Sequence, residues 1–292
     1  MSPPSAQPPS EIVTRLRAAG CVFAEDEARL LVAAARSPAD LAAMVERRAS
    51  GLPLEQVVGW AEFCGLRIIV EPGVFVPRRR TEFLVRQAAA AARRPGRREP
   101  GTVPVVVDLC CGSGALGVAL AAALGGAGEA GEAGVAGGAE LHAADVDPAA
   151  VRCARRNVAA VGGHVYQGDL FEPLPVSLRG RVELLLANVP YIPTGEIGML
   201  PSEGRLYEPR VALDGGPDGL DVLRRVAAAA PGWLAPGGSL LVEAGDQQAA
   251  RAAGIMTWAG LTARVTRRDE LGATVVAGSR AGPGPGPGPA RP

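Results

Sequence analysis

The strongest constraint on the fold is a regular alternation of strand-like and helix-like segments that begins after residue 102. Short apolar runs predict strands at 103–108, 139–145, 164–167, 182–188, 238–242, 263–266 and 273–277. Helical patterns lie between most of them, at 115–124, 148–160, 219–230 and 246–259. This order predicts a doubly wound α/β fold with a largely parallel sheet. The last two strands are joined by only RRDELG, which is too short for a parallel crossover and predicts an antiparallel pair.

The N-terminal part of the chain has a different pattern and predicts a separate unit. Residues 11–52 contain three short amphipathic segments with helix start and stop signals, typical of a small helical domain. Residues 53–80 contain short apolar runs divided by glycine and proline, which predicts a linker built around a β-hairpin. A helix at 81–93 then opens the α/β domain, which we expect to extend over 81–279.

Four segments are too poor in large apolar residues to join a core. Residues 1–10 and 280–292 are rich in proline, glycine or small residues, and we expect both to be disordered. Residues 93–101 read as a charged connector. Residues 125–138 are a low-complexity insertion, which we expect to lengthen one surface loop without altering the fold.

Composition excludes several classes of function. Thirty basic and thirty acidic residues cancel, so the chain lacks the basic excess of a protein that binds nucleic acid or anionic membranes through charge. No apolar run approaches the ~20 residues of a membrane span, and no signal peptide opens the chain. Five cysteines without paired CxxC spacing argue against a zinc site and indicate a reducing compartment. We expect a cytoplasmic protein without metal, membrane or direct nucleic-acid partner.

A glycine-containing turn follows the first strand of the α/β domain. It reads Asp108-Leu109-Cys110-Cys111-Gly112-Ser113-Gly114. Glycine there lets the backbone turn sharply, so that helical N–H groups can face a ligand. Asp145 ends the next strand, where a carboxylate can accept both hydroxyl groups of a ribose. Together the turn and the acid indicate a cofactor with a nucleoside, either NAD or S-adenosylmethionine.

Asp108 helps to separate these two cofactors. A carboxylate directly before the glycines would repel a pyrophosphate, whereas it suits the cationic amino group of a methionine moiety. Asp169 and Leu170 follow the third strand, where the carboxylate could accept a hydrogen bond from adenine and the leucine could pack on the ring. The same pair would also suit a helix cap. We favour S-adenosylmethionine.

The fourth strand ends in Asn188-Val189-Pro190-Tyr191, at the carboxyl edge where open α/β sheets bind ligands. An amide or aromatic amine is a poor nucleophile because its lone pair is delocalised. Two acceptors that take both of its N–H groups can aim the lone pair at a methyl group. Asn188 offers its side-chain carbonyl and Val189 its backbone carbonyl, with Pro190 keeping Val189 extended. Tyr191 can stack on the flat acceptor. The alternative is an ordinary strand end with a turn.

These motifs resemble those of the HemK/PrmC family of protein-(glutamine-N5) methyltransferases, which methylate the glutamine of the GGQ loop in peptide-chain release factors. The resemblance covers about residues 11–278 and is carried by GLPLEQVVGWAEFCGLRIIVEPGVFVPRRRTE, DLCCGSGALGVAL, ADVDP, GDLF, NVPYIP and YEPRVALDGGPDGLDVLRRV. It implies a Rossmann-like class I S-adenosylmethionine-dependent fold. It also implies a cofactor loop at 110–114, a ribose acid at Asp145, adenine contacts at Asp169 and Leu170, and a glutamine site at 188–191. The N-terminal helices would help to dock the release factor.

The chain departs from the family pattern at three places. The usual NPPY reads NVPY, in which Val189 keeps its carbonyl but regains an N–H, so catalysis should persist with looser geometry. The first glycine of DxGxGxG is Cys110, and we expect Cys110 and Cys111 to be packed thiols rather than a redox pair. The usual PRPxTE reads PRRRTE, and we expect the additional arginines to be solvated rather than to touch an acidic partner. These departures suggest a divergent branch whose protein target can differ.

The leading hypothesis is transfer of a methyl group to a protein glutamine by direct displacement, without metal or covalent enzyme intermediate. His142 and His164 have no catalytic role in this scheme. One alternative is an adenine-N6 methyltransferase of nucleic acid, because Asn-x-Pro-Tyr also suits an exocyclic amine; zero net charge disfavours it. Another is methylation of a different glutamine, such as one in a ribosomal protein. A third is a non-catalytic remnant of the fold, which the retained polar groups disfavour.

Overall fold

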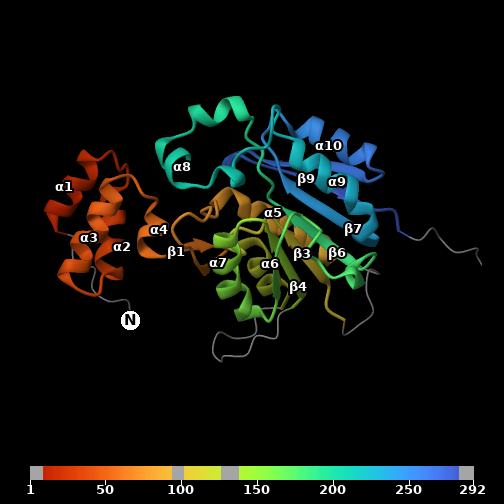
Figure 1. The fold of residues 1–292 in the computed structure, drawn as a ribbon, viewed down its shortest axis with the longest axis horizontal. Coiled ribbons are helices and arrows are strands. Elements are labelled where there is room, and N and C mark those ends of the chain that lie inside the picture. The colour runs from red at the N-terminus through yellow and green to blue at the C-terminus, as the bar shows by residue number, and fades with distance from the viewer. Residues whose placement is uncertain (1–8, 94–101, 126–137, 283–292) are drawn as a thin grey trace, which may run out of the picture.

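The computed structural model describes residues 9–93, 102–125 and 138–282, and shows a helical N-terminal unit beside a larger α/β unit (Figure 1). Most of the expected connector (93–101), of the expected insertion (125–138) and of both tails lies outside the described residues. The expectation of disorder at 1–10 and 280–292 is wrong for the described residues nearest the domains. Ser10 already begins a helix, and the Arg280 backbone N–H donates to the Gly238 carbonyl at 2.9 Å, which continues strand pairing by one residue beyond Ser279.

The N-terminal unit consists of four helices. Their bounds are α1 (Ser10–Ala18), α2 (Ala24–Ala34), α3 (Pro38–Ala49) and α4 (Leu54–Val58). Helix α3 begins as the sequence predicts, because the Ser37 hydroxyl accepts a hydrogen bond from the Asp40 backbone N–H at 3.1 Å and a proline follows the cap. Leu16, Leu31 and Met44 meet in a small apolar core. The five-residue helix α4 is too short for the sequence pattern to have revealed it.

A two-stranded hairpin connects this unit to the large sheet. Strands β1 (Trp60–Phe63) and β2 (Leu66–Ile69) pair antiparallel, as expected. The hairpin is tied to helix α7 (Pro148–Val158) by the side chain of Asn157. Its Oδ1 accepts from the Ile69 N–H at 2.9 Å, while its Nδ2 donates to the Ile69 carbonyl at 2.9 Å and to the Ser113 carbonyl at 2.8 Å. One buried amide thus joins the hairpin to the glycine turn.

The large unit is a Rossmann-like α/β fold with a seven-stranded sheet in the order β5-β4-β3-β6-β7-β9-β8. The strands are β3 (Val105–Leu109), β4 (Glu140–Asp145), β5 (His164–Gln167), β6 (Val182–Ala187), β7 (Leu234–Glu243), β8 (Thr262–Arg268) and β9 (Ala273–Ser279). The first five run parallel, and the β8–β9 pair is antiparallel, as its short connection predicts. That β9 lies between β7 and β8 was not evident from the sequence.

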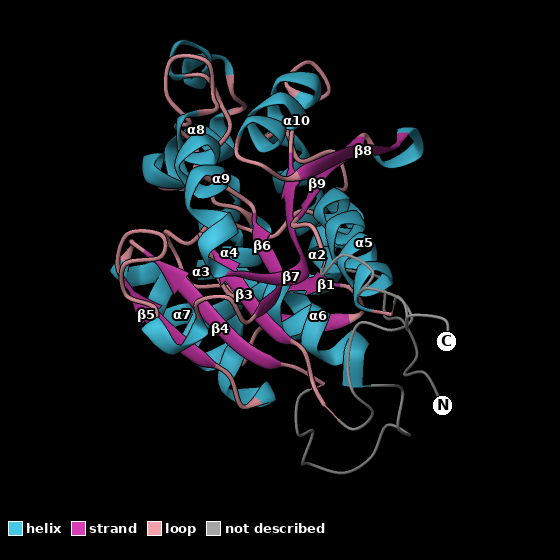
Figure 2. Ribbon diagram, turned by 90° about the vertical axis from the view of Figure 1, so that its right-hand side faces the viewer, coloured by secondary structure: helices cyan, strands magenta, loops and turns pink. Residues whose placement is uncertain are grey.

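Helices cover both faces of this sheet (Figure 2). One face carries α5 (Glu82–Ala92), α6 (Ala115–Gly125) and α7, and the other carries α9 (Asp221–Trp233) and α10 (Ala249–Trp258). Alternate side chains of β3 reach opposite cores: Val106 packs on the first face, and Val105 and Val107 pack on the second. Burial on both faces explains the uninterrupted apolar run.

An irregular segment passes over the carboxyl edge of the sheet. It contains a 3₁₀ helix (Thr194–Met199), helix α8 (Ser202–Tyr207) and a second 3₁₀ helix (Arg210–Ala212). In Figure 1, α8 lies between the N-terminal helices and the α/β unit. The Tyr207 hydroxyl donates to the Ser50 carbonyl at 2.7 Å, so the segment also touches the N-terminal unit. The described residues contain no helix long and apolar enough to cross a membrane.

Candidate functional site

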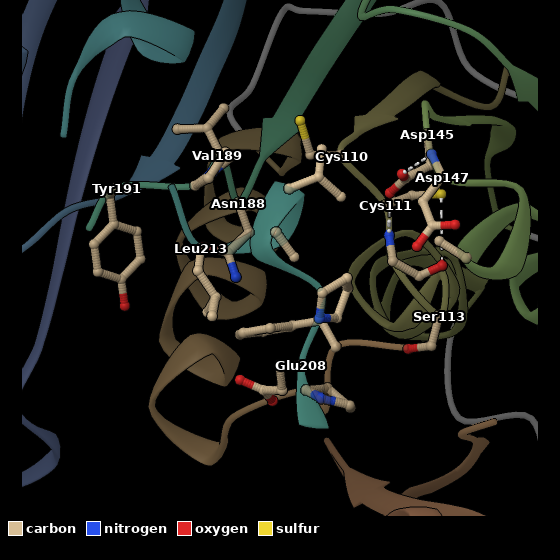
Figure 3. A pocket seen from close by; sticks show the side chains of 18 of the residues that line it. Cys110, Cys111, Ser113, Asp145, Asp147, Asn188, Val189, Tyr191, Glu208 and Leu213 are labelled. Carbon is tan, nitrogen blue, oxygen red and sulfur yellow. Dashed lines mark hydrogen bonds between the residues drawn. The ribbon is translucent and has the colours of Figure 1, made fainter. Parts of the chain in front are cut away.

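A cavity of about 440 Å³ lies at the carboxyl ends of β3, β4 and β6, partly enclosed by the irregular segment over the edge (Figure 3). This size is typical of small-molecule sites. Most of the predicted site residues line it, namely Cys110, Cys111, Gly112, Ser113, Asp145, Asp169, Leu170, Asn188, Val189, Pro190 and Tyr191. Asp108 and Gly114 are not among the residues that line this cavity.

The turn after β3 has a backbone that a ligand can approach closely. Gly112 has φ +55°, and its backbone N–H donates to the Asp145 Oδ2 at 2.8 Å. A Cβ at this position would meet no atom within 4 Å, so the backbone there is open to a ligand. Gly114 has the opposite reason for lacking a side chain, because its Cβ would lie 2.9 Å from the Val158 Cγ2 of helix α7. Gly114 therefore permits close packing against helix α7, and it does not line the cavity.

Cys110 stands where the family pattern has its first glycine. It adopts φ +53°, a left-handed conformation that is uncommon for a residue with a side chain. Cys110 and Cys111 are both free thiols, and burial raises the pKa of each well above the ordinary cysteine value. Thiols held protonated in this way are poor nucleophiles, which agrees with the expected packing role.

The predicted contact between Asp108 and a ligand is wrong for this structure. Asp108 is fully buried, and its Oδ2 accepts from the Gly117 backbone N–H of helix α6 at 2.9 Å. Its Oδ1 is buried without a hydrogen-bond partner among the described residues. The reason is strand geometry: Asp108 lies within β3, so its side chain is directed into the sheet–helix layer instead of past the strand end. Burial raises the pKa of this carboxyl to about 7.

Replacing Asp108 by asparagine is expected to remove a pH dependence of stability. Between about pH 4 and pH 7 the folded chain keeps a proton that the unfolded chain has released, since the folded pKa of about 7 lies above the ordinary value of 3.8. The free energy of unfolding of the unsubstituted protein should therefore fall as pH rises, by up to roughly 4 kcal/mol. Urea unfolding at pH 5 and pH 8 measures this, and parallel pH profiles for both proteins would contradict it.

Asp145 and Asp169 occupy different surroundings in the cavity. The Asp145 carboxylate accepts from the Gly112 N–H at 2.8 Å and, through Oδ1, from the Asp147 N–H at 2.9 Å, which fixes its orientation at the end of β4. Burial raises the pKa of this carboxyl, while both N–H groups oppose that rise. Asp169 instead forms an ion pair with Arg225 of helix α9, a partner that the sequence did not indicate.

The strand-end motif places the Asn188 side chain at the cavity wall and leaves its amide oxygen unsatisfied. The Asn188 Oδ1 is buried and has no hydrogen-bond partner among the described residues. Figure 3 shows the side chains of Asn188 and Tyr191 extending in the same direction from the strand end, with Val189 on the opposite side. Val189 is 3% exposed and packs in the core of the α9 face, which leaves its backbone at the cavity wall. A buried acceptor without a donor costs free energy unless a ligand supplies the donor.

A glycine-rich loop packs closely against the backbone of this motif. The backbone carbonyl of Tyr191 accepts from the Gln248 Nε2 at 2.9 Å. A Cβ at Gly219 would lie 2.2 Å from that carbonyl oxygen, and one at Gly215 would lie 2.6 Å from the Pro190 carbonyl oxygen. The DGGPDG sequence thus permits a close backbone approach to the strand end. This block belongs to the family resemblance, but its sequence does not indicate its position behind the strand end.

Sequence reasoning also missed several charged side chains at the cavity. Arg78 and Arg80 both line it; Arg80 is exposed to solvent, as expected, but it also pairs with an acidic side chain of the same chain, which was not expected. Arg78 pairs with the buried Glu208, whose Oε1 also accepts from the Val76 N–H at 3.3 Å. Arg80 pairs with Glu243 at 2.9 Å. The position of Glu243, as the last residue of a strand at the ligand-binding edge, was a signal that could have identified it.

The arrangement therefore has two halves. One half offers a glycine turn and the Asp145 carboxylate, which fit the methionine and ribose parts of an adenosyl cofactor. The other half offers the unpaired Asn188 oxygen, the backbone of Val189 and the ring of Tyr191, which fit a flat group with two N–H bonds. Within the described residues, no group of His, Cys, Asp or Glu side chains is placed to hold a metal ion.

Comparisons with known proteins identify relatives of the whole chain. No family model matches the chain. A release factor glutamine methyltransferase from Geobacter sulfurreducens is 40% identical over 251 residues, 84% of this chain and 80% of the relative. Further bacterial relatives with that name are 35–39% identical. A relative from Streptomyces pristinaespiralis, named 4-amino-L-phenylalanine/4-methylamino-L-phenylalanine methyltransferase, is 39% identical over 70% of this chain and 65% of its own length.

One solved structure supports the fold alone. The catalytic domain of hMettl16, in complex with MAT2A 3′UTR hairpin 6, superimposes with a TM-score of 0.54 at 14% identity over 84% of each chain.

Proposed function

The chain belongs to the release factor glutamine methyltransferase family, and from that premise we propose that it methylates N5 of a glutamine in the GGQ loop of a peptide-chain release factor. The chain is an S-adenosylmethionine-dependent methyltransferase. The observation that carries the choice of acceptor is the Asn188 side chain at the cavity wall, whose Oδ1 is buried without a partner among the described residues. It is complementary to one N–H of a primary carboxamide.

The cofactor half of the cavity fits S-adenosylmethionine, which when bound supplies a methyl group on a cationic sulfur for a single displacement. The open backbone at Gly112 and the neighbouring residues of the turn would receive the methionine part. The Asp145 carboxylate would accept hydrogen bonds from the ribose hydroxyls while the Gly112 and Asp147 N–H groups keep it oriented. Leu170 would pack on the adenine ring, and Asp169 would accept from its amino group while it remains paired with Arg225.

The acceptor half would orient the amide and hold its nitrogen close to the methyl carbon, and this positioning would account for the acceleration. Asn188 would accept one N–H of the glutamine amide and the Val189 carbonyl the other, which aims the nitrogen lone pair at the methyl carbon. The carbon–sulfur bond would break as the carbon–nitrogen bond forms, and the methylated amide would then release one N–H proton to water. Pro190 restrains Val189 to extended backbone, and the Tyr191 ring flanks the flat amide. Such positioning supplies up to ~7–11 kcal/mol in favourable cases.

In this proposal the protein partner contacts a surface of the chain that is larger than the cavity. We place the release factor against the N-terminal helices and the segment 194–214, because the latter both lines the cavity and touches the N-terminal unit. A release factor acts in translation termination, so we place this enzyme in the cytoplasm.

Transfer of a tritiated methyl group tests the proposal directly. Purified release factor should be labelled at the GGQ glutamine, as located by mass spectrometry, and a release factor with that glutamine replaced by alanine should not be. Free 4-amino-L-phenylalanine and an adenine-containing oligonucleotide serve as competing acceptors. Labelling of either one in preference to the release factor would overturn the proposed acceptor, and so would equal labelling of the alanine-substituted release factor.

Replacing Asp145 by alanine is expected to weaken S-adenosylmethionine binding roughly tenfold or more. The substitution removes a carboxylate that would make charge-assisted hydrogen bonds to the ribose, each worth roughly 1.5–3 kcal/mol. Isothermal titration calorimetry measures the change. Asp147→Ala is the matched control, because Asp147 also lines the cavity but supplies Asp145 through its backbone N–H. An unchanged affinity in Asp145→Ala would remove this residue from the cofactor site.

A further inference from the structure

Tyr191 is held by two side chains from distant parts of the chain. Arg80 lies in a short 3₁₀ helix (Arg79–Thr81), and Glu243 is the last residue of β7. The Arg80 Nε donates to the Glu243 Oε1 at 2.9 Å, and its Nη2 donates to the Tyr191 hydroxyl oxygen. The Tyr191 hydroxyl in turn donates to the same Glu243 oxygen at 3.4 Å. The three side chains therefore form a closed triangle of hydrogen bonds.

The burial of Glu243 makes Arg80 difficult to replace. The Glu243 side chain is 5% exposed, whereas that of Arg80 is 45% exposed and lines the cavity. A carboxylate buried to this extent needs a charged partner, and removing the partner is costly. A guanidinium can donate to the carboxylate and to the phenol at once through its planar fork, which a lysine ammonium does with poorer geometry.

The triangle restrains the ring of Tyr191 from its far end. The backbone of the same residue is already held by Gln248, whose Nε2 donates to the Tyr191 carbonyl at 2.9 Å. Burial raises the pKa of the Tyr191 phenol, so the hydroxyl stays protonated near neutral pH and keeps donating. A ring fixed at both ends keeps one orientation along the cavity wall on the side of Asn188 (Figure 3).

We propose that Arg80 is a positioning residue that acts through Tyr191: anchored on Glu243, it fixes the ring so that the acceptor amide is confined between this ring and Asn188. This inference rests on the proposed role of residues 188–191 as the acceptor site. In this role Arg80 does not contact the reacting atoms itself. Its effect is to reduce the motion of the surface against which the amide lies.

The first test follows the ring without any acceptor. The chain has three tyrosines, so incorporation of 3-fluorotyrosine should give a simple fluorine NMR spectrum, in which Tyr191→Phe identifies the Tyr191 signal. Arg80→Met should shift and broaden this signal and leave those of Tyr166 and Tyr207 in place. Arg79→Met is the matched control, since Arg79 is an exposed neighbour outside the cavity and should change nothing. An unaltered Tyr191 signal in Arg80→Met would overturn the proposal.

The second test is a double-mutant cycle on methyl transfer. Arg80→Met should lower kcat/KM for the protein acceptor about tenfold without changing cofactor affinity. In a Tyr191→Phe background the same change should have little further effect, because the phenol oxygen through which Arg80 acts is gone. Additive losses in the double variant would overturn the proposal. Arg80→Lys should recover part of the rate.

A third variant separates positioning from stability. Arg80→Met leaves the buried Glu243 charge unpaired, so Arg80→Met/Glu243→Gln is measured alongside it. The double variant should regain thermal stability but stay slow in transfer and mobile at Tyr191; full recovery of rate with stability would reduce Arg80 to a structural role and overturn the proposal. If the unsubstituted enzyme does not methylate glutamine at all, the proposed function fails while the fluorine signals still decide the role of Arg80.

Discussion

Asn188→Ala is expected to lower turnover about 10²–10³-fold, the largest loss among the substitutions considered for this protein. The side chain lines the cavity and carries an oxygen that is buried without a partner among the described residues, so its loss removes a preorganised acceptor and leaves the amide free to rotate. Turnover with saturating cofactor and release factor measures the effect. Cofactor affinity and thermal stability should stay close to those of the unsubstituted protein, since no described residue depends on Asn188 Oδ1 for a hydrogen bond.

The result separates catalysis from folding. If the alanine variant folds, binds the cofactor and still turns over at the original rate, then Asn188 does not orient the acceptor, and the proposed mechanism fails. A parallel loss of stability and rate would point instead to a packing role, which the half-buried position of this residue argues against.

Gly219→Ala is expected to lower kcat/KM about 10²-fold, although this residue has no side chain to contribute to the reaction. The new Cβ would lie 2.2 Å from the Tyr191 carbonyl oxygen and 2.4 Å from the Gln248 Nε2, so the strand end or the loop must move. A displacement of about 1 Å at a reacting group is enough for a loss of this size. Stability should fall by about 1–3 kcal/mol, because φ at this residue is +74°.

Gly260→Ala is the matched control for this substitution. Its φ is +83°, so it imposes a similar backbone penalty, but a Cβ there would meet nothing within 4 Å. We expect Gly260→Ala to lose stability and to keep its rate. Equal rates for the two variants would show that close packing behind Tyr191 does not matter for transfer. Steady-state kinetics and urea unfolding on both proteins are sufficient to decide.

The sequence predicts the position of some site residues correctly and of others incorrectly. Asp145 and Asn188 could be placed in advance because each stands at the carboxyl end of a predicted parallel strand, and such ends meet at one edge. Asp108 belongs to the same sheet, yet it lies inside its strand and is directed into the layer below helix α6. A shift of one residue along a strand is enough to reverse the direction of a side chain, and predicted strand ends are uncertain by more than that.

Contacts between distant segments could not be predicted from any local sequence pattern. Arg80 and Glu243 are 163 residues apart, and Asp169 and Arg225 are 56 apart. The pairing of Arg80 could not be predicted, because a local sequence does not reveal a buried carboxylate on another strand. The irregular segment 194–214 was likewise missed, since its helices are too short to show a period.

The sequence by itself determined the fold class, the edge of the sheet that carries the site and the chemical types available there. These follow from short-range properties: apolar periodicity selects strands and helices, and strand direction brings their carboxyl ends together. The tertiary structure decided which of those groups face the cavity, which are paired, and which oxygen remains without a donor. Such outcomes depend on how side chains from remote elements pack and neutralise one another, a property that belongs to the assembled layers and to no single stretch of the chain.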